Sequence, residues 1–160
     1  MYKRILGPLD GSKLSECSLD HIKAIATGCQ VPEVVLLAVL EVVPLPVSWV
    51  ESEEQAERVA KERQQLEKTP QKAQAYLARA ADSLKKVGIP VQTVVIPAKT
   101  GVGAAEGILD YAENNEVDLI IMSTHGRSGV SRWAMGSVAD KVVRHAKDPV
   151  MTVVSAGCRL

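Results

Sequence analysis

The sequence predicts an α/β protein built on a doubly wound parallel β-sheet. Short apolar runs rich in Val, Ile and Leu alternate with helical patterns along the whole 160-residue chain. Two of these runs, residues 34–40 and 117–122, are apolar at nearly every position, as expected for strands that are buried on both faces. Strands joined by helical crossovers pair in parallel, and right-handed crossovers place helices on both faces of the sheet. We therefore expect five strands in the order βαβαβαβαβ.

The first two strands are expected on either side of one helix. The apolar run at 5–6 ends in the Gly- and Pro-containing residues 7–11, which is typical of a buried strand leaving a sheet. Apolar residues at helical spacing follow over 14–25, and Gly28 is expected to end that helix. Residues 34–40 form the second strand.

A charged segment and an amphipathic helix come next. Residues 51–68 mix both signs of charge, which is typical of a solvated helix. We expect Thr69 and Pro70 to interrupt or restart this helix. Beyond them a clearer apolar face predicts a helix that ends at Gly88; its residues are Ala73, Tyr76, Leu77, Ala80, Leu84 and Val87.

The second half of the chain repeats the alternation. Residues 91–96 predict a third strand, which Pro97 closes. The glycines at 101 and 103 are interpreted as a turn before a helix that ends near 114–115. The remaining elements are a strand at 117–122, a helix that opens at 136–137 and a last strand at 149–154. No shift in composition marks a second domain, so residues 1–160 are expected to form one domain.

Composition and charge exclude several classes of function. The 19 basic and 19 acidic side chains cancel, so no overall positive field exists that would gather nucleic acid or anionic lipid. Aromatic residues make up 3% of the chain and Phe is absent, which leaves few stacking platforms for single-stranded nucleic acid. No apolar run approaches the roughly 20 residues that a transmembrane helix needs, and no secretory segment is evident. We expect a cytoplasmic protein without a nucleic-acid or membrane partner.

Neither a metal site nor a catalytic centre is evident in the sequence. Cys17, Cys29 and Cys158 lack the spacing of metal ligands and are expected to be free thiols. No Ser-His-Asp or Cys-His arrangement is identifiable, and no paired carboxylates stand out in the loops that follow the strands.

The stretch from Ser123 to Ser137 carries the strongest functional signal. Ligands of doubly wound sheets bind outside the carboxyl ends of the strands, which is where this stretch lies. Its first part, residues 123–129, contains two glycines, one Arg, one His and several hydroxyls, and a helix begins at the end of the stretch. Phosphate binding needs accessible backbone N–H groups and an inward-pointing helix N-terminus. Gly126 and Gly136 could supply the accessible backbone, and the helix near Ser137 the N-terminus.

Structural explanations of the same residues stay open. Ser137 and Asp140 fit the S-x-x-D capping pattern, so Ser137 could simply cap its helix. Asp10, at the end of the first strand, could accept a hydrogen bond from a ribose hydroxyl or cap the following helix. His125 could contact phosphate or be a polar surface residue.

Together these motifs resemble the universal stress protein family. The resemblance is carried by residues 5–12, 118–129, 136–142 and 149–154, and it extends over essentially the whole chain. Residues 44–70 match the variable connection of the family. The resemblance implies a Rossmann-like sheet of strand order 3-2-1-4-5, similar to that of adenine nucleotide α-hydrolases.

The resemblance also implies an ATP site. The ATP-binding branch has the pattern Gly, two residues, Gly, nine residues, Gly, then Ser or Thr; Gly126, Gly136 and Ser137 match it, whereas Ser123 replaces the first Gly. By position, Asp10 would contact the ribose or adenine, and His125 occupies the usual His position of the family. The implied ligand-binding residues are Pro8, Asp10, Val39, Met122, Ser123, His125, Gly126, Arg127, Gly136, Ser137 and Val138.

Three functions compete. The first is a cytoplasmic protein that binds ATP, with or without Mg²⁺, as a nucleotide-dependent switch or sensor in the stress response. The second is a nucleotide-free dimeric interaction module, towards which Ser123 points. The third is an adenylating enzyme, but the H-x-G-H and S-G-G-x-D-S motifs of such enzymes do not occur. We expect no enzyme, with ATP hydrolysis slow or absent without a partner, because no acid is clearly placed to hold Mg²⁺ near the phosphates.

A homodimer is expected through the last strand, which lies at a sheet edge in the implied strand order. An apolar edge without charged residues invites pairing with a second chain. The alternative is that a helix or residues 155–160 cover this edge in a monomer. The residues expected to form the interface are Val150, Met151, Val153 and Val154.

Overall fold

The computed structural model describes residues 2–40, 53–97, 102–124 and 135–154, and for residues 53–68 it describes only the course of the helix. The elements follow the order that the sequence predicts. They are β1 (Arg4–Pro8), a 3-10 turn η1 (Ser15–Cys17), α1 (Ser18–Gly28), β2 (Glu33–Leu40), α2 (Glu53–Lys85), β3 (Val91–Pro97), α3 (Ala104–Asn114), β4 (Leu119–Ser123), α4 (Ser137–His145) and β5 (Val150–Val153).

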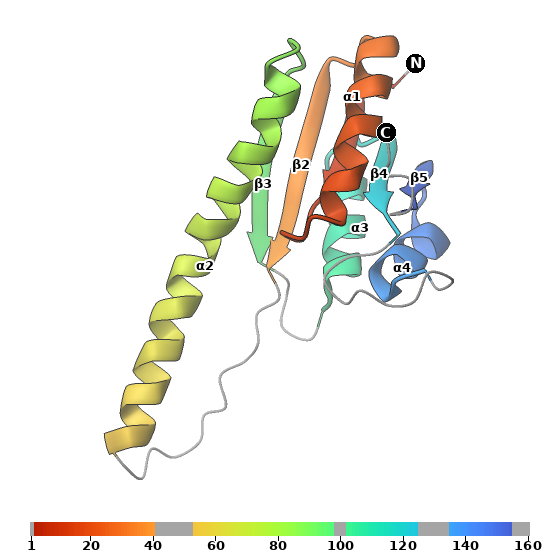
Figure 1. The fold of residues 1–160 in the computed structure, drawn as a ribbon. Helices are drawn as coiled ribbons and strands as arrows, with labels where there is room; N and C mark the ends of the chain where they lie inside the picture. The colour runs from red at the N-terminus through yellow and green to blue at the C-terminus, as the bar shows by residue number, and fades with distance from the viewer. Residues whose placement is uncertain (1, 41–52, 98–101, 125–134, 155–160) are drawn as a thin grey trace.

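The strands form one five-stranded sheet of order β3-β2-β1-β4-β5, in which all neighbours are parallel. This confirms the predicted fold class and strand order. β1 lies at the centre, where Ile5 pairs with Val34 of β2 on one side and with Leu119 of β4 on the other (Figure 1). The chain therefore reverses its direction of winding at β1.

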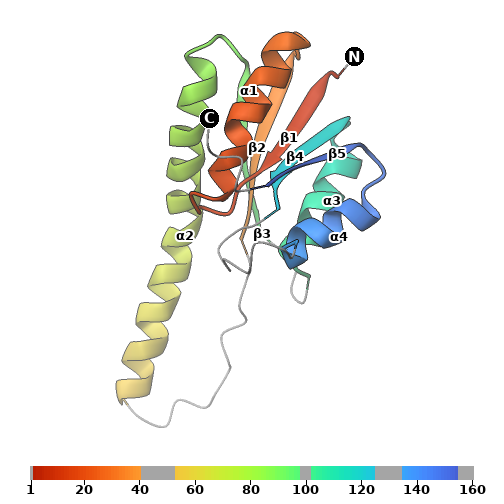
Figure 2. The same cartoon turned by 45° about the vertical axis from the view of Figure 1, so that its right-hand side comes forward.

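Helices cover both faces of the sheet, as the doubly wound pattern requires. α1 and α2 pack on one face, where the core includes Ile5, Leu36 and Ile121. α3 and α4 pack on the other face against alternate residues of the same strands, among them Leu6 and Ile120. The 45° turn of Figure 2 separates the two helical layers. The alternation arises because successive side chains of a strand point to opposite faces.

The side chains of inner strands are more deeply buried than those of edge strands. β1, β2 and β4 are buried at most positions, because each has a strand on both sides and helices on both faces. The edge strands β3 and β5 are half-buried at most positions. A glycine is needed at residue 7 of β1, since a Cβ there would lie 2.6 Å from Ile22 Cδ1 of α1. α1 can therefore approach the sheet closely.

α2 differs from the sequence prediction because it continues through Pro70 without a break. Proline removes one backbone N–H from the helix, and its ring needs space. Pro70 is exposed, so the ring has room, and the residues beyond it are held against the sheet by the buried side chains of Leu77 and Leu84. The first half of α2 extends past the carboxyl ends of β2 and β3 (Figures 1 and 2).

The structure corrects two further predictions, for Val87 and for Cys17. Val87 lies beyond the end of α2 and is exposed, so it does not belong to the buried face of the helix. Cys29 is a free thiol as expected, whereas Cys17 is disulfide-bonded, so the free-thiol prediction is wrong for Cys17. Cys158 lies outside the described residues. Within the described chain, no helix combines the length and apolarity that crossing a bilayer requires.

Candidate functional site

The carboxyl ends of β1 and β4 lie side by side at the point where the strand order reverses. Leu6 pairs with Ile120, so the end of β1 at Pro8 and the end of β4 at Ser123 meet at the same edge of the sheet. This is the place where doubly wound sheets bind ligands. α4 begins at the same edge, because the Gly136 amide donates to the Thr124 carbonyl at 2.8 Å.

Asp10 closes a tight turn after β1. Its Oδ1 atom accepts hydrogen bonds from the backbone N of Ser12 at 2.9 Å and from the Ser12 hydroxyl at 2.6 Å. Gly11, between them, has a φ of +86°, which favours glycine. The N-caps of η1 and α1 are Leu14 and Cys17, without side-chain capping bonds. The capping alternative for Asp10 is therefore wrong, and its exposed carboxylate points to another role.

The first turn of α4 offers backbone N–H groups at the sheet edge. The first helical hydrogen bond runs from Asp140 N to Gly136 O at 2.9 Å, so the amides of residues 137–139 precede it. These amides, together with the positive end of the helix dipole, form an arrangement that binds anions. The Gly136 amide is taken by Thr124, so Gly136 does not itself supply the donor that its glycine suggested.

Ser137 is the first helical residue and not the N-cap. The N-cap is Gly136, which makes no side-chain capping bond. The S-x-x-D capping explanation of Ser137 is therefore wrong. The side chain of Ser137 is exposed beside the amides of residues 137–139, where its hydroxyl is available to a ligand.

Ser123 fits regular strand backbone although it stands where the family pattern has glycine. It is the last residue of β4 and pairs with Val153 of β5. It is two residues from Ile121, so its buried side chain faces the α1 layer, whereas Met122 faces the layer of α3 and α4. The additional Cβ therefore lies on the face opposite to α4 and does not cover its N-terminus.

Thr124 links three elements through its backbone, and the sequence did not predict this role. It is 6% exposed, and its amide donates to the Val153 carbonyl at 2.9 Å while its own carbonyl accepts from Gly136. One buried residue thus ties β4, β5 and α4 together. A polar residue just after a buried strand was the only signal available in the sequence.

Val39 lies at the same edge of the sheet. Pro8 pairs with Leu37, so Val39, two residues further along β2, lies at the same edge as the turn that follows β1. α3 approaches Val39 at Gly107, where a Cβ would lie only 2.8 Å from Val39 Cγ1. Gly107 is thus a second position that sequence reasoning missed, because a single glycine inside a helix indicates no particular neighbour.

Two ion pairs connect α3 with α4 and with the segment that follows it. Lys141 of α4 forms an ion pair with Glu106 of α3, and Lys147 forms one with Glu113 at 3.2 Å. The hydrogen bond from Lys141 holds the pKa of Glu106 below its usual value. The first pair joins α3 to α4, and the second joins α3 to the segment that follows α4.

Tyr76 of α2 reaches the Asp10 turn on the face of the sheet that α1 and α2 cover. Burial raises the pKa of Tyr76 to about 12, and the neighbouring carboxylates of Glu16 and Asp10 act in the same direction. Its hydroxyl lies near the side chains of Ser15 and Glu16, but within the described chain no donor or acceptor has hydrogen-bond geometry with it.

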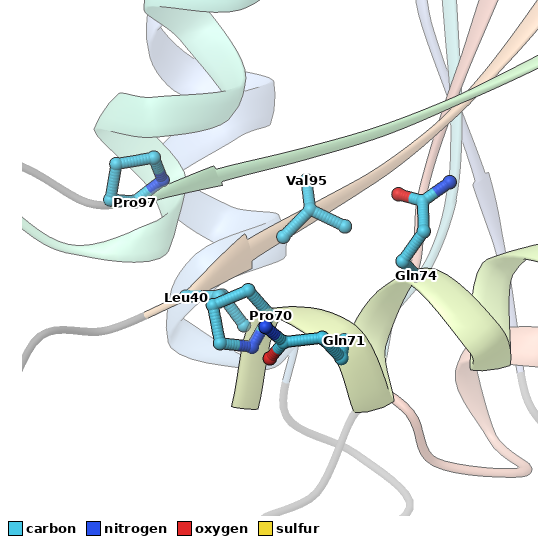
Figure 3. A pocket seen from close by; sticks show the side chains of 6 residues that line it. All are labelled: Leu40, Pro70, Gln71, Gln74, Val95 and Pro97. Carbon is cyan, nitrogen blue, oxygen red and sulfur yellow. The ribbon is translucent and has the colours of Figure 1, made fainter. Parts of the chain in front are cut away.

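A groove of about 380 Å³ lies between α2 and the ends of β2 and β3 (Figure 3). None of the predicted site residues lines this groove; its lining residues are Leu40, Pro70, Gln71, Gln74, Val95 and Pro97. Three of the predicted site residues, His125, Gly126 and Arg127, lie outside the described residues. The structure brings the others together at one edge of the sheet. Pro8 and Val39 lie at the ends of β1 and β2, Asp10 lies in the turn after β1, and the rest lie at the end of β4 and the start of α4.

The fold and the site define a Rossmann-like α/β protein that presents a helix N-terminus at its switch point. Within that class, the chain belongs to the universal stress protein family, whose sequence model matches residues 1–154. A relative of Methanocaldococcus jannaschii, universal stress protein MJ0577, is 29% identical over 96% of this chain and 95% of its own length. The solved structure of MJ0577 aligns with this protein at a TM-score of 0.77, and the alignment covers 96% of each chain.

Two more distant solved structures support the fold alone. A universal stress protein solved in complex with cAMP is 19% identical, with a TM-score of 0.65 and coverage of 96% of this chain and 98% of that one. The Archaeoglobus fulgidus protein solved in complex with dAMP is 18% identical, with a TM-score of 0.55 and coverage of 95% and 97%.

Proposed function

We propose that this protein binds ATP at the edge formed by β1, β4 and α4, and acts as a nucleotide-dependent switch or sensor in the stress response. The observation that carries the proposal is the α4 N-terminus, whose amides at 137–139 precede the first helical hydrogen bond beside the end of β4. Such an arrangement binds phosphate because the N–H groups and the helix dipole both favour negative charge.

The adenosine half of the ligand would lie towards β1 and β2. Asp10 has an exposed carboxylate that can accept a hydrogen bond from ribose, and Val39 lies near the end of the neighbouring strand β2. The cAMP and dAMP complexes of the two distant relatives support an adenine nucleotide as the ligand class. The choice of ATP comes from the glycine pattern, in which Gly126 and the pair Gly136–Ser137 keep the spacing of the ATP-binding branch.

The phosphates would lie against α4, with Ser137 donating its hydroxyl and residues 137–139 their amides. Mg²⁺ would enter with the nucleotide, because Mg²⁺ in such sites is held largely by phosphate oxygens and water. Hydrolysis is expected to be slow or absent without a partner. Phosphoryl transfer needs an acid that holds the metal and a residue that orients water, and Asp10 is assigned to the adenosine side.

The proposal includes a cytoplasmic homodimer that pairs through β5. β5 has β4 as its only neighbour among the described strands, and Val154 beyond it is 54% exposed. An edge strand with exposed apolar side chains is a template for pairing with a second copy.

The test is the nucleotide content of the purified, denatured protein, followed by calorimetric titration of the nucleotide-free protein with ATP, AMP and GTP. We expect an adenine nucleotide in the extract and tighter binding of ATP than of AMP or GTP. If neither measurement detects an adenine nucleotide at millimolar ligand, the proposed switch is wrong, and the nucleotide-free interaction module becomes the preferred function.

A further inference from the structure

Cys17 is a buried cysteine that takes part in a disulfide bond. It ends η1 and is the N-cap residue of α1, where it packs in the core beneath α1 and α2 together with Ile121 and Val153. The chain contains three cysteines, and Cys29 is a free thiol. The partner of Cys17 is therefore a cysteine other than Cys29.

The position of Cys29 at the opposite end of α1 excludes it on independent grounds. Cys17 is the N-cap residue and Cys29 the C-cap residue of this helix, so the helix separates their Cα atoms by about 18 Å at 1.5 Å per residue. A disulfide joins residues whose Cα atoms lie about 4–7 Å apart. Within one folded chain, Cys158 is the remaining candidate.

The end of β5 lies close enough for the chain beyond it to bring Cys158 to Cys17. In the order β1-β4-β5, β5 is two strands from β1, which is about 10 Å at the usual strand spacing. η1 follows β1 and packs against β4. The residues from Val153 to Cys158 can span about 17 Å when extended. The cross-link is therefore within reach of the C-terminal chain.

We propose that Cys17 and Cys158 form a reversible disulfide, which makes this protein a sensor of the thiol–disulfide balance of its surroundings. Disulfides of cytoplasmic proteins are typically transient and serve catalysis or redox sensing. The bond fastens the chain that follows β5 to η1, close to the turn after β1. The inference takes only the cytoplasmic location from the proposed function and does not require nucleotide binding.

The fold can accommodate Cys17 in its reduced form. The sulfur lies 3.7 Å from the Lys13 carbonyl oxygen, so a thiol at this position can donate a weak hydrogen bond there. A reduced cysteine also behaves as a small apolar side chain, which suits a place in the core. The start of α1 does not need the side chain, because Cys17 makes no side-chain capping bond. Both redox states are therefore compatible with the fold, as a reversible bond requires.

The oxidant is a small-molecule disulfide of the glutathione class. One protein thiolate attacks it, forms a mixed disulfide and releases one small thiol. The second protein thiolate then attacks the mixed disulfide, closes the protein bond and releases the other small thiol. The two protein thiols thus lose two electrons and two protons, and the small disulfide gains them to become two thiols. The reverse reaction consumes two small thiols.

Peptide mapping of the full-length protein tests the pairing. The protein is equilibrated with glutathione disulfide, alkylated and digested with trypsin without reduction. Cleavage after Lys and Arg places Cys17 in peptide 14–23, Cys29 in 24–58 and Cys158 in 148–159. Mass spectrometry should find 14–23 joined to 148–159 and Cys29 alkylated, in a protein of monomer mass. A bond to 24–58, a bond between two copies of the chain, or alkylation of all three cysteines would overturn the proposal.

Thermal unfolding tests whether the bond restrains the fold. Reduction by a phosphine should lower the melting temperature of the wild-type protein by about 5–15 °C, because a disulfide that closes a long loop restricts the unfolded chain. Cys158→Ser and Cys17→Ala should each lose this response to the reductant, and the matched control Cys29→Ser should keep it. The first variant leaves the described core untouched. A wild-type melting temperature that the reductant does not change would contradict the proposed link.

Glutathione buffers of graded ratio decide whether the bond is a switch. The protein should pass from the reduced to the oxidised form within the range of the cytosolic glutathione poise. A bond that stays fully formed at the reducing end of this range would be a fixed structural link and would overturn the inference. Failure to bind any adenine nucleotide would overturn the proposed function and leave these measurements unaffected.

Discussion

Gly136 is the N-cap of α4, and its backbone conformation does not itself require glycine. Its φ of −61° and ψ of 149° are accessible to any residue. Gly136→Val should therefore leave the fold intact while its branched side chain covers the amides of residues 137–139. We expect ATP to bind more than tenfold more weakly, a loss of about 1.4 kcal/mol or more, as measured by calorimetric titration.

Gly103→Val provides the matched control for that variant. Gly103 is the N-cap of α3, also in extended backbone, and among the described residues a Cβ there meets the flexible end of Glu106 at 3.3 Å. Its ATP affinity should equal that of the wild-type protein. Undiminished affinity in a folded Gly136→Val protein would show that the phosphates do not lie on α4.

The raised pKa of Tyr76 predicts that the protein loses stability in strong alkali. Because burial raises its pKa to about 12 from an ordinary value of 10.0, the unfolded chain ionises first as the pH rises. Stability from this group is complete below pH 10, falls between pH 10 and 12 and is lost above the folded pKa. The free energy of unfolding of Tyr76→Phe, measured in urea, should therefore decline less than that of the wild-type protein between pH 9 and 11.5.

Removal of the hydroxyl also has a consequence at neutral pH. The Tyr76 oxygen is buried without a hydrogen-bond partner in the described chain, so its loss leaves no group unsatisfied. Tyr76→Phe should be as stable as the wild-type protein or more stable at pH 7. A clearly less stable variant would mean that the hydroxyl has a partner in solution.

Among the elements, α2 shows that packing against the sheet can override a helix break that the local sequence predicts. Proline within a helix costs about 3 kcal/mol relative to alanine, which is why the sequence predicts an interruption at Pro70. The structure keeps one helix from Glu53 to Lys85. The sheet holds the second half in place, and the charged first half tolerates one missing hydrogen bond.

Pro70→Ala tests the continuity of this helix. Alanine restores the missing amide donor, so we expect a gain of about 1–3 kcal/mol in the free energy of unfolding and a stronger helical signal at 222 nm. Gln71→Ala is the control, since Gln71 is the exposed neighbour and lines the same groove (Figure 3). If Pro70→Ala gains no more than the control, the helix is interrupted at Pro70 in solution, as the sequence alone suggests.

At the scale of the whole molecule, the sequence predicts the sheet far better than the site. Continuous apolar runs such as 34–40 identify buried parallel strands because burial on both faces leaves no polar position. Whether Asp10 and Ser137 cap a helix could not be predicted in this way. Each fits a capping pattern, and only the placement of the N-cap at Leu14, Cys17 or Gly136 excludes it. Tertiary packing shifts the first residue of a helix by one or two positions, and the local sequence pattern does not record that shift.

The structure shows which residue of the proposed dimer interface can be mutated without damage to the core. Among the residues expected at the interface, Val153 is 4% exposed and belongs to the core beneath α1 and α2. A charge at Val153 would therefore disrupt the fold and not only a dimer. Val150 and Met151 are half-buried, whereas Val154, just beyond β5, is 54% exposed and can accept a charge without loss of core packing.

Val154→Lys should therefore convert a dimer into a monomer, because two such edges would meet antiparallel across a two-fold axis and bring like charges together. Val143→Lys is the matched control, since Val143 on α4 is also an exposed valine, at 42%. Sedimentation equilibrium at micromolar concentration should find the wild-type protein and Val143→Lys dimeric and Val154→Lys monomeric. A monomeric wild-type protein would mean that the β5 edge does not pair, and a dimer that survives Val154→Lys would place the interface on another surface.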